Sequence, residues 1–149
     1  MALKAGDVIP KFTATDAAGN LFDSESIIGK KGAIIYFYPK DDTSQCTAQA
    51  CGFRDNYDVF LNLGVEVVGI SSDDVDSHQE FAKKYNLPFI LLSDSDNAIR
   101  KLFGVPSSFL GLLPGRVTYL VDKQGVIQMV FDSLQGMKHV SKMIEKLTK

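Results

Sequence analysis

Two nearly continuous runs of apolar residues limit what this chain of 149 residues can fold into. Residues 33–38 read AIIYFY and residues 65–70 read VEVVGI, so both runs are rich in β-branched and aromatic side chains. Such runs are typical of strands that a sheet buries on both faces. Between them, apolar side chains recur at helical spacing from Thr47 to Leu63. We therefore expect a strand, a helix and a second strand.

The rest of the chain continues the alternation of strands and helices. Before the first run, we expect a β-hairpin from residues 12–15 and 21–23. After the second run, we expect a helix capped by Asp76 or Ser77 that carries Phe81 and Tyr85, a strand at 89–92, and a short helix from Asp94 or Ser95 to Leu102 that ends at Gly104. A second hairpin from residues 117–121 and 126–131 and a last helix complete the chain. This order predicts an α/β fold with a central mixed β-sheet flanked by helices and an N-terminal β-hairpin. The length and the absence of a linker predict one domain over residues 1–149.

Composition argues against several classes of partner. The net charge is −2, and basic and acidic residues are interspersed without a basic stripe. We therefore expect no nucleic-acid partner. No apolar run approaches the roughly 20 residues that a membrane span needs, so we expect no membrane span. The N-terminus lacks the apolar core of a signal peptide, so we expect any targeting peptide to be absent or already removed.

The two cysteines are too few for a disulfide scaffold. They are also too few for a zinc site unless His78 and His139 join them, and these residues lack the spacing of metal ligands. We expect both histidines on helix surfaces and predict no metal. In isolation, the two cysteines could simply be small buried apolar residues.

The position of the two cysteines in the chain indicates reactive thiols rather than core residues. Pro39 ends the strand at 33–38, and a short polar turn leads to Cys46 and Cys51 at the start of the next helix. In open α/β sheets, functional sites lie beyond the carboxyl ends of strands. A cysteine in the first turn of a helix lies near its unpaired amide hydrogens and the positive end of its dipole, which favours the reactive thiolate.

Other groups can assist that thiolate. Thr43 can bring a hydroxyl near the sulfur, Pro39 and the surrounding aromatic residues can restrict water, and a cation can approach from elsewhere in the fold. A thiolate attacks a peroxide oxygen and becomes a sulfenic acid, so we interpret the segment as a peroxide-reducing thiol site.

Cys51 is the obvious partner to resolve that sulfenic acid, but helix geometry opposes the bond. Five residues along a helix rise by about 7.5 Å and rotate by about 140°, whereas a disulfide needs Cα atoms within about 7 Å. We therefore expect the first turns of the helix to unwind during each catalytic cycle.

The motif Pro39-x-x-x-Thr43-x-x-Cys46 resembles the active-site motif of peroxiredoxins. Cys51, five residues later, and the segment Leu113-Pro114-Gly115-Arg116 are similar to the Q-type peroxiredoxins, also called bacterioferritin comigratory proteins. The likeness extends from about residue 5 to the C-terminus, and landmarks such as residues 67–71 and 104–106 contribute to it.

The resemblance implies a thioredoxin-like fold and reduction of hydrogen peroxide and alkyl hydroperoxides, with thioredoxin as the reductant and without a metal or organic cofactor. It implies that Cys46 is the peroxidatic cysteine and Cys51 the resolving cysteine, joined in an intrachain disulfide. Thr43 would hydrogen-bond the thiolate and the peroxide, Arg116 would stabilise the thiolate and polarise the peroxide, and Pro39 would shield the sulfur. A monomer is expected.

The chain departs from the family pattern at Ser44 and Gln45, where the family usually has Pro-Gly. This removes a fixed φ and a permissive glycine from the turn. Residues 112–116 and the C-terminal half are similar to the plant and algal branch, which works in chloroplasts. We therefore expect a chloroplast location for a processed form, with a cytoplasmic location as the alternative.

Two other functions remain open. A thioredoxin-like disulfide oxidoreductase would usually carry Cys-x-x-Cys, which is absent here. A redox switch could use Cys46 and Cys51 to expose an apolar helix surface without catalytic turnover. The exposed strand of the N-terminal hairpin and the apolar loop at residues 109–113 are the two candidate contacts for the reductant.

Overall fold

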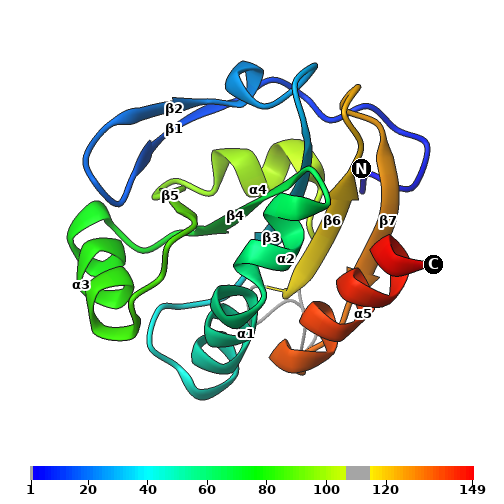
Figure 1. Cartoon of the computed structure of the whole chain (residues 1–149). Coiled ribbons are helices and arrows are strands. Elements are labelled where there is room, and N and C mark those ends of the chain that lie inside the picture. The colour runs from blue at the N-terminus through cyan, green and yellow to red at the C-terminus, as the bar shows by residue number, and fades with distance from the viewer. Residues whose placement is uncertain (1, 107–114) are drawn as a thin grey trace.

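The computed structural model describes residues 2–106 and 115–149. Among these residues, seven strands form one mixed sheet in the order β2-β1-β5-β4-β3-β6-β7 (Figure 1). The strands are β1 (Thr13–Asp16), β2 (Leu21–Asp23), β3 (Gly32–Phe37), β4 (Val65–Ser71), β5 (Ile90–Ser93), β6 (Val117–Val121) and β7 (Ile127–Asp132). The helices are the 3-10 helix η1 (Ser24–Ser26) and the α-helices α1 (Ser44–Asp55), α2 (Tyr57–Asn62), α3 (Val75–Tyr85), α4 (Ala98–Phe103) and α5 (Gly136–Thr148). The predicted mixed sheet with helices and an N-terminal hairpin is confirmed.

The three central strands β3, β4 and β5 run parallel, and every other neighbouring pair is antiparallel. Along β3, Ile34 and Tyr36 pack beneath α1, α2, α3 and α5, whereas Ile35 and Phe37 pack on the opposite face with α4 and with Ile27 after η1. Both faces of β3 are therefore covered, which explains the unbroken apolar sequence of this strand.

The single helix predicted from Thr47 to Leu63 is wrong. The helix begins earlier, at Ser44, and breaks at Asn56 into α1 and α2. The Asn56 side-chain amide donates to the Gly52 carbonyl at 2.9 Å, which is the acceptor that the Asn56 backbone would use in a continuous helix. The Asn56 backbone N–H instead reaches the carbonyl of Phe53, so the ladder shifts at this residue.

Two predicted helix starts also need correction. Asp74, and neither Asp76 nor Ser77, caps α3, because its carboxylate accepts from the Ser77 backbone N–H at 2.8 Å. The next helix, α4, starts at Ala98 and ends at Gly104 in a left-handed conformation. Asp94 still contributes to its start, since its carboxylate accepts from the N–H groups of Ile99 and Arg100.

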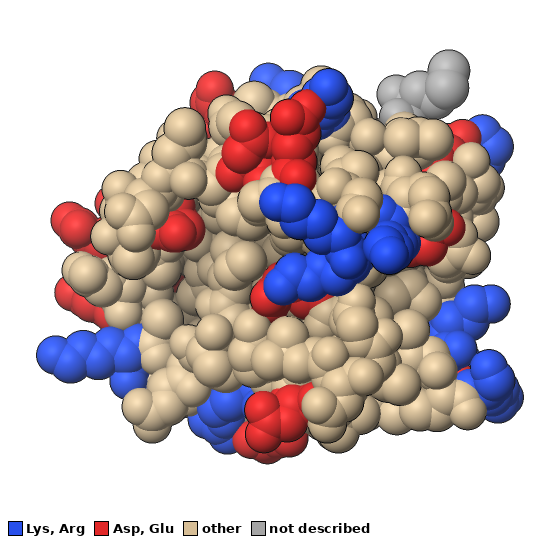
Figure 2. Space-filling model, turned by 45° about the horizontal axis from the view of Figure 1, so that its top comes forward, with Lys and Arg blue, Asp and Glu red and all other residues tan. Residues whose placement is uncertain are grey.

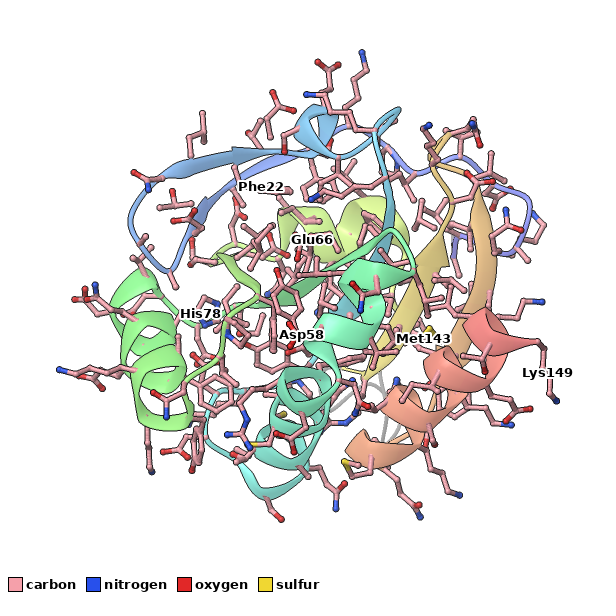
Figure 3. All side chains as sticks on the ribbon, viewed as in Figure 1. Phe22, Asp58, Glu66, His78, Met143 and Lys149 are labelled. Atoms are coloured by element: carbon pink, nitrogen blue, oxygen red, sulfur yellow. The ribbon has the colours of Figure 1, made fainter. Side chains whose placement is uncertain are left out.

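The expectation that both histidines lie on helix surfaces is wrong. His78 and His139 are fully buried, and Figure 3 shows His78 on the side of α3 that faces the sheet. Each imidazole can be buried at little cost because both of its ring nitrogens have hydrogen-bond partners.

The exposed surface carries both signs of charge. On the face in Figure 2, lysine and arginine side chains lie beside aspartate and glutamate side chains, without a continuous basic stripe. None of the helices in the described part of the chain has the length and apolar character to cross a lipid bilayer.

We expect Phe103→Ala to lower the free energy of unfolding by about 3–5 kcal/mol, the range for emptying a buried aromatic site. Phe103 is fully buried, and its ring contacts those of Phe12, Phe37 and Tyr119. Denaturant unfolding would measure the loss. Leu102→Ala is the matched control, because the Leu102 side chain is 50% exposed. Equal losses in the two variants would contradict this packing.

Candidate active site

The cysteine predicted to react lies where the carboxyl end of β3 turns into α1. The β3 strand ends at Phe37, the chain passes through the half-buried Pro39, and α1 starts at Ser44. Cys46 is therefore the third residue of α1, within its first turn, and is only 1% exposed. This position near the unpaired amides of the helix favours negative charge on its sulfur.

Arg116 supplies the cation that was expected from elsewhere in the fold. It directly precedes β6, whose first residue, Val117, pairs with Phe37 of β3. The antiparallel register thus brings Arg116 to the end of β3 that leads to Cys46. Its Nη2 atom lies 3.3 Å from Cys46 Sγ. Arg116 is 4% exposed, so little water screens this contact.

Two further acceptors orient the Arg116 guanidinium. Its Nη1 atom donates to Gln49 Oε1 at 2.6 Å, and its Nε atom donates to the Leu134 carbonyl at 3.2 Å. Among the ion pairs of residues 2–106 and 115–149, none includes Arg116. The neutral acceptors fix the plane of the guanidinium without neutralising it, so its charge remains available to Cys46.

Gln49 is a site residue that the sequence interpretation missed. It is fully buried, and its Nε2 atom has no hydrogen-bond partner among the described residues. Its position three residues after Cys46 could have indicated it, because residues three apart share a helix face. The sequence held no sign that this face would meet Arg116.

The other predicted site residues lie near Cys46 in the chain, with different contacts. Thr43 is the N-cap residue of α1, but its hydroxyl donates to the Lys40 carbonyl at 2.9 Å rather than to α1. Among the hydrogen bonds of the described residues, none joins Thr43 to Cys46. Cys51 is half-buried in the same helix, and both cysteines are free thiols. The two thiols thus occupy the helical arrangement whose geometry opposes a disulfide.

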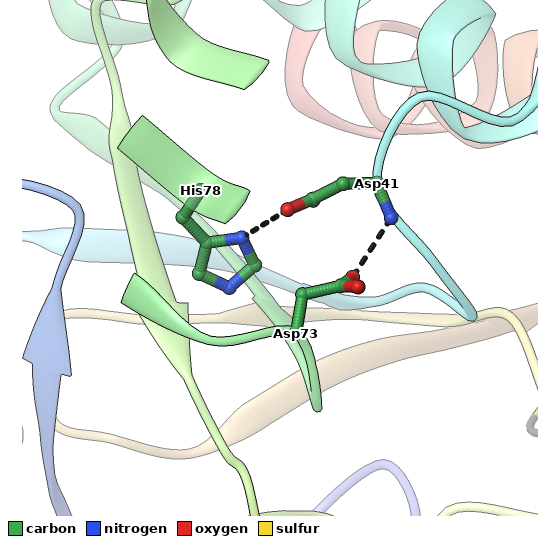
Figure 4. Close-up of side chains that lie close together, drawn as sticks. All are labelled: Asp41, Asp73 and His78. Carbon is green, nitrogen blue, oxygen red and sulfur yellow. Dashed lines mark hydrogen bonds and ion pairs between the residues drawn. The ribbon is translucent and has the colours of Figure 1, made fainter. Parts of the chain in front are cut away.

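A buried polar network holds the turn between Pro39 and Thr43. Asp41 accepts from Tyr38 Oη at 2.6 Å and from Ser77 Oγ at 2.8 Å, and its Oδ2 atom lies 2.7 Å from His78 Nδ1 (Figure 4). The Asp41 backbone N–H donates to Asp73 Oδ2 at 2.8 Å. The active-site turn is therefore fastened to α3 and to the segment after β4.

Asp41, Asp73 and His78 are also the one group of described side chains close enough together to hold a metal ion. Their atoms are already engaged, however. His78 Nε2 faces the Leu92 carbonyl at 2.9 Å while Nδ1 faces Asp41, so both ring nitrogens point at acceptors. Hydrogen bonds to neighbouring groups therefore already occupy the atoms of this cluster that could bind a metal.

Arg100 joins the two sides of the site. Its guanidinium donates to the carbonyls of Gly115 and Tyr38 at 3.0 Å and 3.4 Å. These two carbonyls directly precede Arg116 and Pro39. Sequence reasoning missed Arg100, whose position in a short amphipathic helix carries no signal of this contact. Leu113 and Pro114 of the predicted motif and the loop at residues 109–113 lie outside the described residues.

His139 holds the turn whose Leu134 carbonyl accepts a hydrogen bond from Arg116. Its Nδ1 atom lies 2.7 Å from Thr118 Oγ1, and its Nε2 atom lies 2.7 Å from the Ser133 carbonyl. The carbonyl acceptor places the ring hydrogen on Nε2, so Nδ1 accepts from Thr118. Ser133 precedes Leu134, whose carbonyl receives Arg116 Nε. A neutral His139 therefore fixes the turn that orients the guanidinium.

Comparison with known proteins agrees with this geometry. Residues 5–130 match the model of the AhpC/TSA family. The chain is 49% identical over 143 residues to the chloroplastic peroxiredoxin Q of Populus jackii, an alignment that covers 95% of this chain and 67% of that protein.

Solved structures give the same result. The peroxidoxin BcpB of Mycobacterium tuberculosis is 30% identical, with a TM-score of 0.89 over 98% of this chain and 97% of that chain. A bacterioferritin comigratory protein of Xanthomonas campestris, described for its alkyl peroxide reduction activity, is 25% identical, with a TM-score of 0.85 over 95% of this chain and 98% of that chain.

We expect acid to destabilise the protein through His139. Burial, as the main cause, and the nearby Arg116 charge lower the pKa of His139 from 6.5 to about 4. Between these values the unfolded chain binds a proton that the folded chain does not. The free energy of unfolding therefore falls as the pH drops from 6.5 towards 4, by about 1.4 kcal/mol per pH unit and about 3 kcal/mol in all.

Denaturant unfolding of the native chain and of His139→Gln, repeated across this pH range, tests the expectation. The advantage of the native chain should shrink as the pH falls, because glutamine does not titrate. His78 is present in both proteins, so its contribution cancels in the difference. A difference that stays constant with pH would show that His139 is not held neutral.

Proposed function

Since the chain belongs to the AhpC/TSA family and is a thiol peroxidase of the peroxiredoxin Q type, we propose that Cys46 reduces the peroxide and that Cys51 resolves the product. The contact between Arg116 Nη2 and Cys46 Sγ at 3.3 Å supports this proposal most directly. A guanidinium that approaches a buried sulfur stabilises the thiolate, which is the nucleophilic form of cysteine.

In the first step, the Cys46 thiolate attacks one oxygen of the peroxide. The O–O bond breaks, the other oxygen takes a proton from solvent and leaves as water or an alcohol, and Cys46 becomes a sulfenic acid. Negative charge moves from the sulfur to the leaving oxygen, and Arg116 can donate to both atoms with separate N–H groups. The Thr43 hydroxyl donates its own hydrogen to the Lys40 carbonyl, so its oxygen can accept a hydrogen bond from the O–H group of the peroxide.

In the second step, the Cys51 thiol attacks the Cys46 sulfenic acid, water leaves, and an intrachain disulfide forms. Both sulfurs belong to α1, and a helix keeps them too far apart. The first turns of α1 must therefore unwind before this step. Thr43 and Ser44 are exposed at the start of α1, so the helix can unwind from this end.

Thioredoxin is the proposed reductant, because a disulfide made within one chain is returned to two thiols by a dithiol protein through thiol–disulfide exchange. Hydrogen peroxide and organic hydroperoxides are the proposed substrates. We propose that the enzyme acts as a monomer. We also propose a chloroplast location, which the name of its Populus relative supports. A cytoplasmic location is the alternative.

A redox switch without turnover is the second candidate function. It would use the same oxidation of Cys46, followed by unwinding of α1 and exposure of the apolar side chains that α1 buries, such as Ala50 and Phe53. Sustained peroxide consumption distinguishes the enzyme, since a switch consumes peroxide only once for each chain in the absence of recycling.

We expect Cys46→Ser and Cys51→Ser to separate the two steps. Peroxide consumption would be measured with thioredoxin, thioredoxin reductase and NADPH. Cys46→Ser should consume none, because it lacks the nucleophile, whereas Cys51→Ser should complete one turnover and stop. Continued cycling of Cys51→Ser would mean that the reductant reaches the sulfenic acid directly. A native chain that stops after one turnover would favour the switch.

We expect Arg116→Lys to slow the oxidation of Cys46 by about 100-fold, the loss typical of one transition-state donor. A lysine ammonium keeps the charge but lacks the planar fork that meets Cys46, Gln49 and Leu134 together. Rapid-quench measurement of sulfenic acid formation would give the rate. Arg54→Lys makes the same change at an arginine of α1 that does not contact Cys46, and it should leave that rate unaltered. An unaltered rate in Arg116→Lys would contradict a role for the fork.

A further inference from the structure

Gln45 makes a contact that the family's usual glycine could not make. Its Oε1 atom accepts from the Gly136 backbone N–H at 2.8 Å, across 91 residues of sequence. Gly136 is the first residue of α5, whose own N-cap residue, Gln135, makes no side-chain hydrogen bond to the helix. Gln45 of α1 therefore caps α5 from a neighbouring helix.

The packing between the two helices brings these atoms together. A Cβ atom at Gly136 would collide with the Gln45 carbonyl and would come within 2.8 Å of Gln49 Cβ. Only glycine fits at that position, and its amide is left facing the first turn of α1. At the other end of the contact, a Cβ atom at Gly52 would lie 2.8 Å from Met137 Sδ and 2.9 Å from Val140 Cγ2. The start of α5 thus lies directly against the segment that carries both cysteines.

The turn before α1 is fastened through Asp41 and Asp42, and Cys46 meets Arg116, but residues 43–45 between them have few hydrogen bonds to the rest of the fold. Its N-cap residue, Thr43, makes no capping hydrogen bond, and Thr43, Ser44 and Gln45 are exposed. The contact between Gln45 and Gly136 is therefore a direct tether on the turn that places Cys46 beside Arg116. When this turn unwinds, that hydrogen bond must break and the α5 amide must lose its partner.

We propose that Gln45 is a positioning residue that holds Cys46 in its helical arrangement by capping α5, and that it thereby sets the rate at which the disulfide between Cys46 and Cys51 forms. This inference rests on the proposed two-step function. Gln45 does not touch the sulfur, so the attack of Cys46 on the peroxide proceeds through the same Arg116 and Gln49 contacts whether or not the cap is present.

We expect Gln45→Ala to accelerate disulfide formation by about fivefold, the change in population that loss of one helix cap produces. Sulfenic acid formation should keep its native rate. The chain contains no tryptophan, so rapid quenching with a thiol-alkylating reagent, followed by mass spectrometry, would follow both steps after one equivalent of hydrogen peroxide.

Two variants serve as controls. Gln135→Ala removes the same side chain from the exposed residue next to Gly136 and should form the disulfide at the native rate. Gln45→Glu keeps an acceptor oxygen and adds negative charge at the N-terminus of α5, which should cap it at least as well. We therefore expect Gln45→Glu to form the disulfide no faster than the native chain. A native rate in Gln45→Ala, or equal acceleration in Gln45→Glu, would overturn the proposal.

Hydrogen exchange on the reduced proteins separates this proposal from the two-step function, because it needs no peroxide. The amides of residues 47–49, the first that are hydrogen-bonded within α1, should exchange about fivefold faster in Gln45→Ala than in the native chain and in Gln135→Ala. Unchanged exchange would overturn the role of Gln45 even if the disulfide forms as proposed. Faster exchange in a chain that forms no disulfide would leave the tether in place and would reject only the proposed role of Cys51.

Discussion

The buried guanidinium of Arg116 is the interaction on which the rest of the site depends. A single side chain meets α1 at Cys46 and Gln49 and the turn before α5 at Leu134. Burial of a cation is costly unless its hydrogen bonds are satisfied. Neutral acceptors on Gln49 and Leu134 offset part of this cost, and the Cys46 sulfur is the third group that the guanidinium meets. Its position in turn requires β6 to pair with β3 in the observed register.

Much of this arrangement was predictable from local sequence. The apolar run at residues 33–38 indicated a strand buried on both faces, and Pro39 marked its end. From these two features, the place of Cys46 at the start of a helix followed. Such predictions succeed because they depend on residues that are close together in the chain. The break at Asn56 is also local, but it arises because the Asn56 side chain, instead of its backbone N–H, donates to the Gly52 carbonyl. The spacing of apolar residues does not reveal this.

Long-range contacts explain what the sequence did not reveal. His78 meets Asp41 across 37 residues, and His139 meets Thr118 across 21 residues. An isolated polar residue in an amphipathic helix is normally solvent-exposed, and only the partners brought by the fold make burial favourable. Gln45 is the same kind of case. The sequence showed that the family's usual Pro-Gly pair is missing at Ser44 and Gln45, whereas the structure shows what Gln45 contacts.

The break at Asn56 divides the helical segment between β3 and β4 into α1 and α2. α2 keeps its own attachment to the core through the fully buried Phe60 and through Tyr57, whose hydroxyl donates to Glu66 of β4 at 2.7 Å. Loss of structure in one helix therefore does not have to propagate into the next, because the hydrogen-bond ladder is already interrupted between them. In the proposed catalytic cycle, α1 would unfold locally around Cys46 while the adjoining sheet stays folded, and the return to the reduced state would be a local refolding event.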